Sequence, residues 1–530
     1  MLDRNSRHPA ATLLPGLSRR SFLTTSAASL AGLALAPSSL LAQPPSTQEP
    51  TLVNTPLGRL RGQLVDGVRV FRGIPFAQPP VGQLRFLPPV PAQPWSGERE
   101  ALRFAAAAVQ SNSSTLPQGE DCLYLNVWAP QGPGPFPVYV SIHGGGYTGG
   151  SSFAPIFDGS HFTRNGIVLV TVAYRLGVFG FLELEPLLGP SYSDSANNAL
   201  RDLYTALDWV HHNIEAFGGD PTRVTIGGES AGAKATAALM AVPAASRLFQ
   251  SAISESGGGE RVVTVAQAAQ VAEQFGRIWR TTHPSASGTL NDLLTAPATD
   301  LLTAQNALIA ASEMHFPLRP LIGHALLPHS PATVVAETPH LGKRLLIGTN
   351  RDESAAFLGP HPAADPTARD LGNLPLATFN SVFARYRALY PEMTPEQLRI
   401  RAATAEEYWV PSVRFAAANL RSGGTSWMYR LDYAKPTGPM AGQAYHALDL
   451  SLVWQMLDHD EQADPAAAPL AQQMHTAWAS FIRGEAPTAP GLPAWPAITP
   501  ASRPTMVLAA TPRLERDPAE AELRLWDGVL

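Results

Sequence analysis

The sequence is short of cysteine and of charge, and it contains no internal repeat. The single cysteine among its 530 residues is Cys122, which excludes a framework of intrachain disulfides and any metal site made from several cysteines. Charged residues make up 15% of the chain and the formal net charge is −5, a balance that argues against a nucleic-acid binder. Hydrophobic residues reach 45%, enough for a large buried core. The 43 glycines and 50 prolines are spread along the chain as turn signals and form no low-complexity tract.

Residues 1–42 have the pattern of an export signal. A basic start with four arginines precedes Ser21–Ala42, a moderately apolar stretch without charge. Pro37 interrupts this stretch and weakens its interpretation as a transmembrane helix. The run "SRRSFL" (Ser18–Leu23) resembles the twin-arginine export motif, although Thr24 stands where a basic residue usually follows.

This pattern predicts a cleaved and exported protein. We expect cleavage after Ala42, with the small-x-small run Ala34–Ala36 as the other site. The mature chain over 43–530 is then acidic, and we expect it in the periplasm or outside the cell, without stable insertion in a membrane. An uncleaved N-terminus that anchors the protein to a membrane is the alternative.

Short apolar runs rich in β-branched residues predict strands that are buried on both faces, as in a parallel sheet. A later run, Trp427–Tyr433, predicts one more strand of the same kind. The five earlier runs are Val138–Ile142, Ile167–Tyr174, Val224–Gly228, Gln250–Ser254 and Arg344–Thr349.

A helix is predicted between the second and third of these runs, because apolar side chains recur every three or four residues from Leu200 to Ile214. Another begins directly after Ser230, in "AGAKATAALM". This order of strand, helix and strand predicts an α/β fold with a large, mostly parallel central sheet flanked by helices. The stretches at about 259–342 and 359–426 have helical or loop-like patterns, and we expect them to be insertions near the carboxyl edge of the sheet, where such sheets bind ligands.

The segment "VTIGGESAGA" (Val224–Ala233) places Ser230 between a predicted strand and a predicted helix. Gly228 and Gly232 flank it, as a sharp strand-to-helix turn requires. Such a turn exposes the serine Oγ at the top of the sheet, near the positive end of a helix. Ser230 is therefore a candidate nucleophile; a glycine-rich turn without a catalytic role is the alternative.

A second glycine run, "IHGGGYTGG" (Ile142–Gly150), ends the first strong predicted strand. Three successive glycines let backbone N–H groups turn toward one point, and acyl transfer needs such donors where the carbonyl oxygen gains charge. The H-G-G-G pattern is a partner of the serine turn, and Ala231 would add the N–H of the residue after the nucleophile.

Together these segments resemble the type B carboxylesterases, the cholinesterase-like branch of the α/β-hydrolase fold. The resemblance covers nearly the whole mature chain, from Thr55–Gly62 to Trp495–Leu508. Three further blocks that resemble this family are "FRGIPFAQPPVGQLRF" (Phe71–Phe86), "EDCLYLNVWAP" (Glu120–Pro130) and "LFQSAISESG" (Leu248–Gly257).

The resemblance implies a catalytic triad in the chain order Ser, Glu, His. The block "LLIGTNRDESAAFL" places the acid at Glu353, with the neighbouring Asp352 as its competitor. The block "QAYHALDLSLVW" places the histidine at His446, one of 14 histidines in the chain.

The same resemblance implies that Gly145 and Gly146 donate to the oxyanion together with Ala231. In the implied reaction, His446 takes the proton of Ser230, whose oxygen attacks the ester carbonyl; water then hydrolyses the acyl-enzyme. No metal ion and no organic cofactor is expected.

Two departures from the family concern its disulfide and its choline site. Members usually bridge the cysteine that corresponds to Cys122, but the partner position, near Ala108, is not cysteine here. We therefore expect a free, buried thiol. The segment between these two residues contains no tryptophan, so recognition of a quaternary ammonium by cation–π contact is not indicated there.

Four residues are candidates for the walls of the substrate pocket. The block that begins at Phe316 resembles one that borders the acyl pocket in this family, and this makes Met314, His315 and Phe316 candidates, with core packing as the alternative role of each. Glu229, beside the nucleophile, is the fourth. We expect its side chain to point away from the serine Oγ and to play a supporting role rather than that of the general base.

The leading functional hypothesis is a serine carboxylesterase that hydrolyses small or aryl esters, with an ester and water as its partners. A hydrolase or amidase for a bulky acyl substrate is an alternative within the same chemistry. A non-catalytic adhesion module of the same fold is a third, which the presence of Ser230, Glu353 and His446 makes less favoured.

Overall fold

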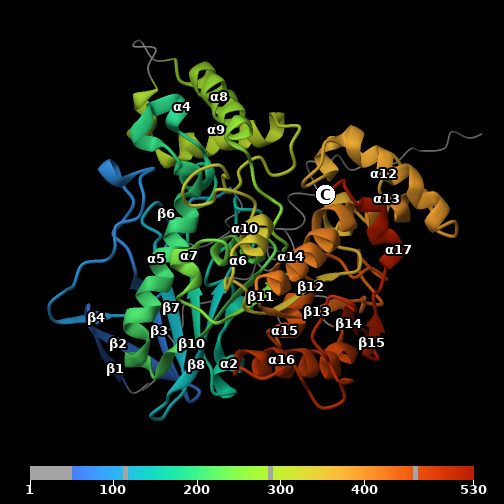
Figure 1. Cartoon of the computed structure of the whole chain (residues 1–530). Helices are drawn as coiled ribbons and strands as arrows, with labels where there is room; N and C mark the ends of the chain where they lie inside the picture. Colours follow the sequence, from blue (N-terminus) through green and yellow to red (C-terminus); the bar gives the residue numbers. More distant parts are fainter. Residues whose placement is uncertain (1–49, 112–116, 285–289, 458–463) are drawn as a thin grey trace, which may run out of the picture. The chain divides into compact units, whose positions relative to one another are not determined.

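A computed structural model describes residues 50–111, 117–284, 290–457 and 464–530. The predicted signal over 1–42 lies outside these residues. Within them, thirteen strands form one sheet in the order β1-β2-β3-β7-β9-β8-β10-β11-β12-β13-β14-β15, with β4 paired to β2 (Figure 1). The strands are β1 (Pro50–Thr55), β2 (Gly58–Val65), β3 (Val68–Pro75), β4 (Glu98–Glu100), β7 (Tyr124–Ala129), β8 (Phe136–Ile142), β9 (Val168–Val172), β10 (Gly219–Glu229), β11 (Ser251–Glu255), β12 (Arg344–Asn350), β13 (Thr425–Leu431), β14 (Pro504–Leu508) and β15 (Arg513–Arg516). A separate pair is formed by β5 (Ala107–Ala108) and β6 (Gln118–Gly119).

The strands from β9 to β14 are parallel, and antiparallel strands complete both sides of the sheet. All six runs predicted as strands belong to this parallel part. Their residues are buried almost throughout, as expected for strands that helices cover on both faces. The fold class predicted from the sequence is therefore confirmed.

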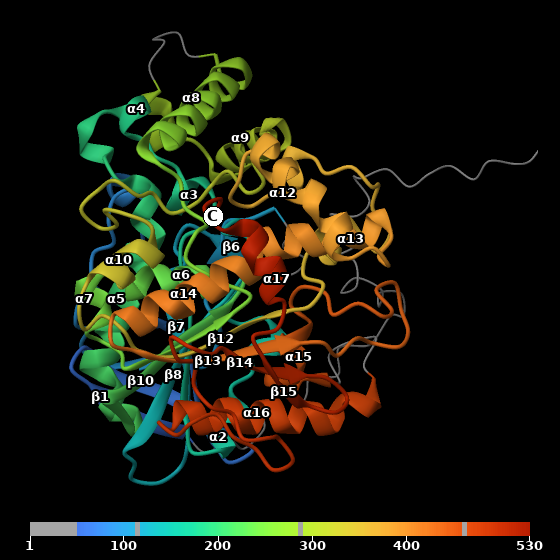
Figure 2. The ribbon, with the colours of Figure 1, turned by 45° about the vertical axis from the view of Figure 1, so that its right-hand side comes forward.

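Two hydrophobic cores lie on the two faces of the sheet, and β8 shows how one strand serves both. Val138 and Val140 belong to the core that includes α5 (Asn198–Asn213) and α6 (Ala231–Met240). Tyr139, between them, belongs to the other core, with α2 (Ser160–Arg164), α15 (Leu448–Val453) and α16 (Ala468–Ile482). Because successive side chains of a strand point to opposite faces, this alternation fixes which helices cover each face (Figure 2).

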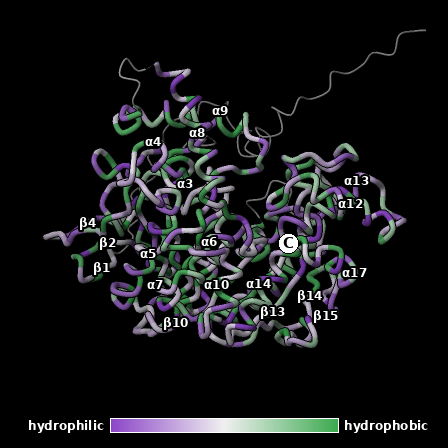
Figure 3. The backbone as a smooth tube through the Cα atoms, turned by 45° about the horizontal axis from the view of Figure 1, so that its top comes forward, coloured by the Kyte–Doolittle hydropathy of each residue, from purple (hydrophilic) through white to green (hydrophobic). Residues whose placement is uncertain are grey.

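The two stretches predicted as insertions form six helices among the described residues, and α8, α9, α12 and α13 lie above the sheet in the view of Figure 1, whereas α14 packs against β12 and β13. Hydrophobic and hydrophilic colours alternate along α8 (Figure 3), whose buried residues recur every three or four positions. The second stretch runs two residues into β13. The helices are α8 (Val265–Thr282), α9 (Ala298–Ala311), α10 (Pro331–Glu337), α12 (Leu376–Leu389), α13 (Pro395–Thr404) and α14 (Val410–Arg421), with a π-helical turn, η8 (Ala405–Trp409), between the last two. No helix of the described residues is both long and apolar enough to cross a membrane.

Candidate active site

Ser230 occupies the sharp turn between β10 and α6. Its backbone has φ 56° and ψ −121°, outside the regions that most residues prefer. Both flanking glycines lie against the end of β8: a Cβ on Gly228 would come within 2.2 Å of the Ile142 carbonyl oxygen, and one on Gly232 within 2.0 Å. The pattern G-x-S-x-G is therefore required at this turn by the space available, as well as by its conformation.

A chain of two hydrogen bonds joins the three residues predicted as a triad. Ser230 Oγ lies 2.8 Å from His446 Nε2, and His446 Nδ1 lies 2.6 Å from Glu353 Oε2. An ionised carboxylate only accepts hydrogen bonds, so Nδ1 carries the proton and Nε2 is free to accept from the serine. Asp352, the competitor for the acid, instead pairs with Arg351 at 2.7 Å.

Glu353 is fully buried, and the second oxygen of its carboxylate has two donors of its own. Ser256 Oγ donates to Oε1 over 2.5 Å and the backbone N–H of Asn350 over 2.7 Å. Thr404 holds the next residue, because its Oγ1 accepts from the N–H of Ser354 at 3.0 Å. Ser256 was missed as a functional candidate, although it lies inside a block that carries the family resemblance; nothing in its immediate sequence indicates a partner 97 residues away.

Burial tunes His446 toward its neutral form. Desolvation lowers the pKa of this histidine below its ordinary value, while the carboxylate of Glu353 acts in the opposite direction. A neutral imidazole is the form that takes a proton from a serine, so the site is prepared for general-base chemistry near neutral pH.

The glycine run after β8 forms the loop beside Ser230. Gly145 and Gly146 have φ values of +112° and +62°, which glycine adopts readily. A Cβ on Gly146 would approach the ring of Phe316 to 2.5 Å. Ala231 is the first residue of α6, where backbone N–H groups have no acceptor within the helix. The three positions expected to form the oxyanion site thus flank the nucleophile with donors that the fold leaves available.

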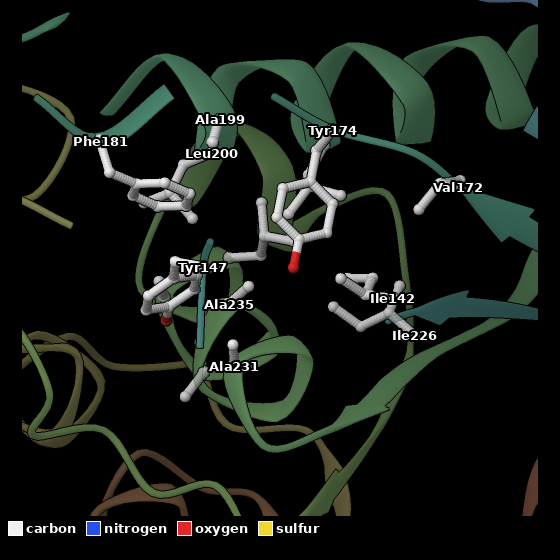
Figure 4. Close-up of a cluster of buried hydrophobic side chains, with 14 of the residues drawn as sticks. Ile142, Tyr147, Val172, Tyr174, Phe181, Ala199, Leu200, Ile226, Ala231 and Ala235 are labelled. Carbon is white, nitrogen blue, oxygen red and sulfur yellow. The ribbon is translucent and has the colours of Figure 1, made fainter. Parts of the chain in front are cut away.

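The residues around this loop hold it in place. The ring of His143 stacks on that of Tyr174 at 4.5 Å, and the Tyr174 hydroxyl donates to the His143 carbonyl at 2.8 Å. Burial lowers the pKa of His143 to about 4, so this imidazole is neutral and structural. Figure 4 shows Tyr147 close to Ala231 and Ala235 of α6, so the loop and the first turn of that helix share one core.

Glu229 corrects one expectation drawn from the sequence. Its carboxylate does not turn away from the site: Oε1 lies 3.1 Å from His446 Nε2, the same atom that faces Ser230 Oγ. No described residue forms a hydrogen bond with this oxygen. Desolvation raises the pKa of Glu229 well above its ordinary value, and nearby carboxylates, Asp449 foremost, add to the rise.

Aromatic side chains surround His446. The rings of Tyr408 and Phe357 lie 5.0 and 5.1 Å from its imidazole. Phe357 also contacts two of the predicted pocket residues, His315 at 5.7 Å and Phe316 at 6.0 Å between ring centres. Met314, by contrast, packs against a small hydrophobic cluster with Val263 and Leu321 among its members.

A buried network of charges lies behind Tyr408. Lys234, on the helix that begins at the nucleophile, lies 4.4 Å from the Tyr408 ring and 3.3 Å from a carboxylate oxygen of Glu407. Arg261 pairs with the same oxygen. Desolvation lowers the pKa of Lys234 well below its ordinary value. This network is a feature that reasoning from the sequence did not find, since its members come from three distant segments.

Cys122 is a free, buried thiol, as expected, and burial raises its pKa. Such a thiol is a poor nucleophile because little thiolate forms. Among the described residues, no group of three or more His, Cys, Asp or Glu side chains is arranged to hold a metal ion.

Comparison with known proteins identifies the family. The sequence model of the carboxylesterase family matches residues 49–526. The para-nitrobenzyl esterase of Bacillus subtilis (strain 168) is 38% identical over 496 residues, which cover 89% of this chain and 97% of that protein. Liver carboxylesterase 1F of Rattus norvegicus is 30% identical and covers 91% and 94% of the two chains.

One partial match and two solved structures support the same family assignment. Fumonisin B1 esterase of Sphingopyxis macrogoltabida is 36% identical over 325 residues, or 59% of this chain and 58% of that protein. A solved PNB esterase superposes with a TM-score of 0.79 at 35% identity and covers 89% of this chain and 99% of its own. A carboxylesterase of Geobacillus stearothermophilus gives 0.79 at 35%, with 90% and 100% covered. The chain therefore belongs to the carboxylesterase family, has the α/β-hydrolase fold, and is a carboxylic ester hydrolase.

Proposed function

We propose that the protein hydrolyses small or aryl carboxylic esters with Ser230 as nucleophile, His446 as general base and Glu353 as the residue that orients the imidazole. The observation that carries this proposal is the continuous chain from Ser230 Oγ to His446 Nε2 (2.8 Å) and from His446 Nδ1 to Glu353 Oε2 (2.6 Å).

The reaction proceeds in two halves. His446 removes the proton of Ser230 as Oγ attacks the ester carbonyl, and the N–H groups of Gly145, Gly146 and Ala231 stabilise the oxyanion. The imidazolium then protonates the leaving alcohol, and the acyl group stays on the serine. Water enters, gives a proton to His446 and attacks the acyl carbon. His446 then returns this proton to Ser230 Oγ as the bond between Oγ and the acyl carbon breaks, which releases the acid and restores the serine.

The carboxylate of Glu229 has a place in this cycle. While His446 is neutral, Nε2 offers a lone pair, and Glu229 Oε1 at 3.1 Å has nothing to accept from it. Once the imidazolium forms, the Nε2 proton lies between Ser230 and Glu229. The positive charge formed beside Glu229 at that moment opposes the rise that burial causes in the pKa of Glu229 and favours its carboxylate form. The resulting charge-assisted contact favours the transition state over the resting enzyme.

The ring of Phe357 lies beside His446, and the ring of Phe316 contacts that of Phe357. These two rings support aryl groups as part of the substrate, because aromatic rings contribute stacking and apolar contact. The name of the para-nitrobenzyl esterase relative is consistent with this class. A hydrolase for a bulky acyl substrate is the second candidate, and the partial match with a fumonisin B1 esterase favours it.

One experiment tests both the mechanism and the substrate class. Hydrolysis of a panel of p-nitrophenyl and benzyl esters, with acyl chains of increasing length, gives kcat/KM for the protein and for Ser230→Ala. We expect short acyl and aryl esters to be preferred and Ser230→Ala to be inactive but folded. Intact-mass analysis after reaction with an organophosphate should show one adduct, on Ser230. Full activity of the variant, or an adduct elsewhere, would contradict the proposed nucleophile.

Export through the twin-arginine route is part of the same proposal, supported by the run Ser18–Leu23 and the uncharged stretch Ser21–Ala42 that follows it. N-terminal sequencing of the protein recovered from the periplasm or the medium of an expressing bacterium should begin just after residue 42. A cytoplasmic product that still begins at residue 1 would contradict it.

A further inference from the structure

Lys234 is a buried lysine that the proposed reaction does not use. It lies on α6, four residues after Ser230, and only 3% of its side chain is exposed. Burying a charged group is unfavourable unless partners surround it. The turn at the nucleophile needs only small neighbours of the serine, so it does not explain a lysine at this position.

Three electron-rich groups surround the Lys234 amino group. Nζ lies 3.3 Å from a carboxylate oxygen of Glu407 and 4.4 Å from the centre of the Tyr408 ring, and it donates to the backbone carbonyl of Ser256 over 3.4 Å. An ammonium has three N–H donors and no lone pair, and each of these three groups attracts it. The surroundings of Nζ are therefore those of a charged lysine, although desolvation and the charge of Arg261 lower its pKa.

Two of these partners contact the proposed triad. The Tyr408 ring packs on the imidazole of His446, with 5.0 Å between ring centres. The Ser256 hydroxyl donates to Glu353 over 2.5 Å. Lys234 thus joins the helix that begins at the nucleophile to the groups that hold the base and the acid.

Glu407 is the counter-charge of Lys234 and of a second buried cation. Arg261 is 1% exposed at its side chain and pairs with the same carboxylate oxygen as Lys234. The carboxylate of Glu406 does not serve them, because it accepts from the backbone N–H groups of residues 372–374. Two cations therefore share one carboxylate, and this cluster carries a net positive charge beside Tyr408.

We propose that Lys234 is a positioning residue of the triad, whose ammonium fixes Tyr408 and Ser256 and whose positive charge acts on His446 across the Tyr408 ring. The inference rests on the proposed function, because it concerns the same triad. In a buried site the effective permittivity is far below that of water, so a charge on one side of a ring affects a group on the other side. The positive charge disfavours the imidazolium in the resting enzyme, and Glu407 limits this effect.

Charged and titratable groups approach His446 and Lys234 from several elements. Desolvation lowers the pKa of His446, whereas Glu353 raises it. Lys234 and Arg261 act in the same direction as desolvation. The other charged or titratable groups near the two side chains are Tyr408, Glu229, Glu255, Glu406, Asp449 and Arg319. All of them are retained in the variants below, so a difference between variants reports the charges that are changed.

The test is the pH dependence of kcat/KM for p-nitrophenyl acetate, an ester without a titrating group, because its acid limb reports the base of the free enzyme. Lys234→Met keeps an unbranched side chain and removes the charge, so the acid limb should move to higher pH by about 0.5–1. Glu407→Gln leaves two cations without their carboxylate, so the limb should move to lower pH by about as much. The double variant removes one charge of each sign, and its limb should lie within about 0.2 of the wild-type value.

Lys343→Met is the matched control. Lys343 also places its ammonium over an aromatic ring, that of Phe249 at 5.5 Å, but it precedes β12 and so lies at the end of this strand opposite to Glu353. Its pH profile should equal that of the wild type. Thermal unfolding checks that each variant is folded, and either single variant of the cluster decides the question if the other does not fold.

Shifts of opposite sign that cancel in the double variant support the proposal, because a loss of packing alone would not be reversed by a second substitution. An unchanged limb in Lys234→Met, shifts of both single variants in one direction, or an equal shift in Lys343→Met would overturn it. Ser230→Ala separates this failure from that of the proposed function. Activity in Ser230→Ala contradicts the triad itself, whereas an inactive Ser230→Ala with an unchanged limb in Lys234→Met contradicts only the role of Lys234.

Discussion

Ser256→Ala removes one hydrogen bond from the acid of the proposed triad and little else. Ser256 and Glu353 are both fully buried, and the hydroxyl donates to Oε1 over 2.5 Å. A hydrogen bond to a charged group contributes about 1.5–3 kcal/mol. If this contribution is expressed fully in the transition state, kcat falls by about 10- to 150-fold, since 1.36 kcal/mol is a factor of ten. The N–H of Asn350 still holds the same oxygen, so we expect the lower half of this range.

The assay is steady-state hydrolysis of p-nitrophenyl acetate, with thermal unfolding as the check on the fold. Ser254→Ala is the matched control: Ser254 lies two residues earlier, is equally buried, and its Oγ has no hydrogen-bond partner among the described residues. This variant should keep kcat within about twofold, a small effect compared with the loss of a bond to a charged group. A Ser256→Ala enzyme with wild-type kcat, or an equal loss in Ser254→Ala, would refute the supporting role of Ser256.

Three further predictions concern the oxyanion loop, the base and the core. Gly146→Ala places a Cβ 2.5 Å from a neighbouring ring at φ +62°, so kcat/KM should fall by about 10²–10³, as on loss of an oxyanion donor; a loss under threefold speaks against that role. Burial lowers the pKa of His446, so the acid limb of the kcat/KM profile should lie below pH 6.5, with the base neutral above it; a limb above pH 7 contradicts this. Arg175 is buried and lies 2.7 Å from Asp202. Asp202→Asn removes the counter-charge of Arg175 and should lower the free energy of unfolding, measured with denaturant, by about 3–5 kcal/mol. Asp220→Asn removes the charge from the more exposed pair with Arg223 and should lower the free energy of unfolding by under about 1 kcal/mol in the same assay. Equal losses in the two variants would refute the claim that burial makes the Asp202 pair the more important one.

The turn at Ser230 and the oxyanion loop could be predicted from the sequence because the conformation of each depends on a few neighbouring residues. Glycine is required on both sides of Ser230 because a Cβ there would clash with the end of β8. Glycine is favoured in the oxyanion loop because the φ values there are positive. Each requirement involves only a few consecutive residues, so a short sequence pattern is enough to predict it. The buried strands were equally readable, since burial on both faces leaves a continuous apolar run.

Glu353 and His446 could not be predicted from constraints on neighbouring residues. Their own sequence surroundings did not distinguish them from Asp352 or from the other histidines, and the family resemblance alone pointed to them. The structure places His446 beside Ser230 across 216 positions of the chain. In the structure the Glu229 carboxylate lies beside the imidazole, whereas the sequence led us to expect a side chain that points away from the serine Oγ.

The sequence by itself determined the fold class, the sharp turn at Ser230 and the glycine loop, because strand burial and backbone strain act over a few neighbouring residues. Only the tertiary structure decided the partners of the carboxylates: Ser256 with Glu353, and Glu229 with His446. The physical reason is that these contacts join side chains from distant strands and helices. Their distances follow from the register of the sheet and the packing above it, and no short segment of the chain encodes either.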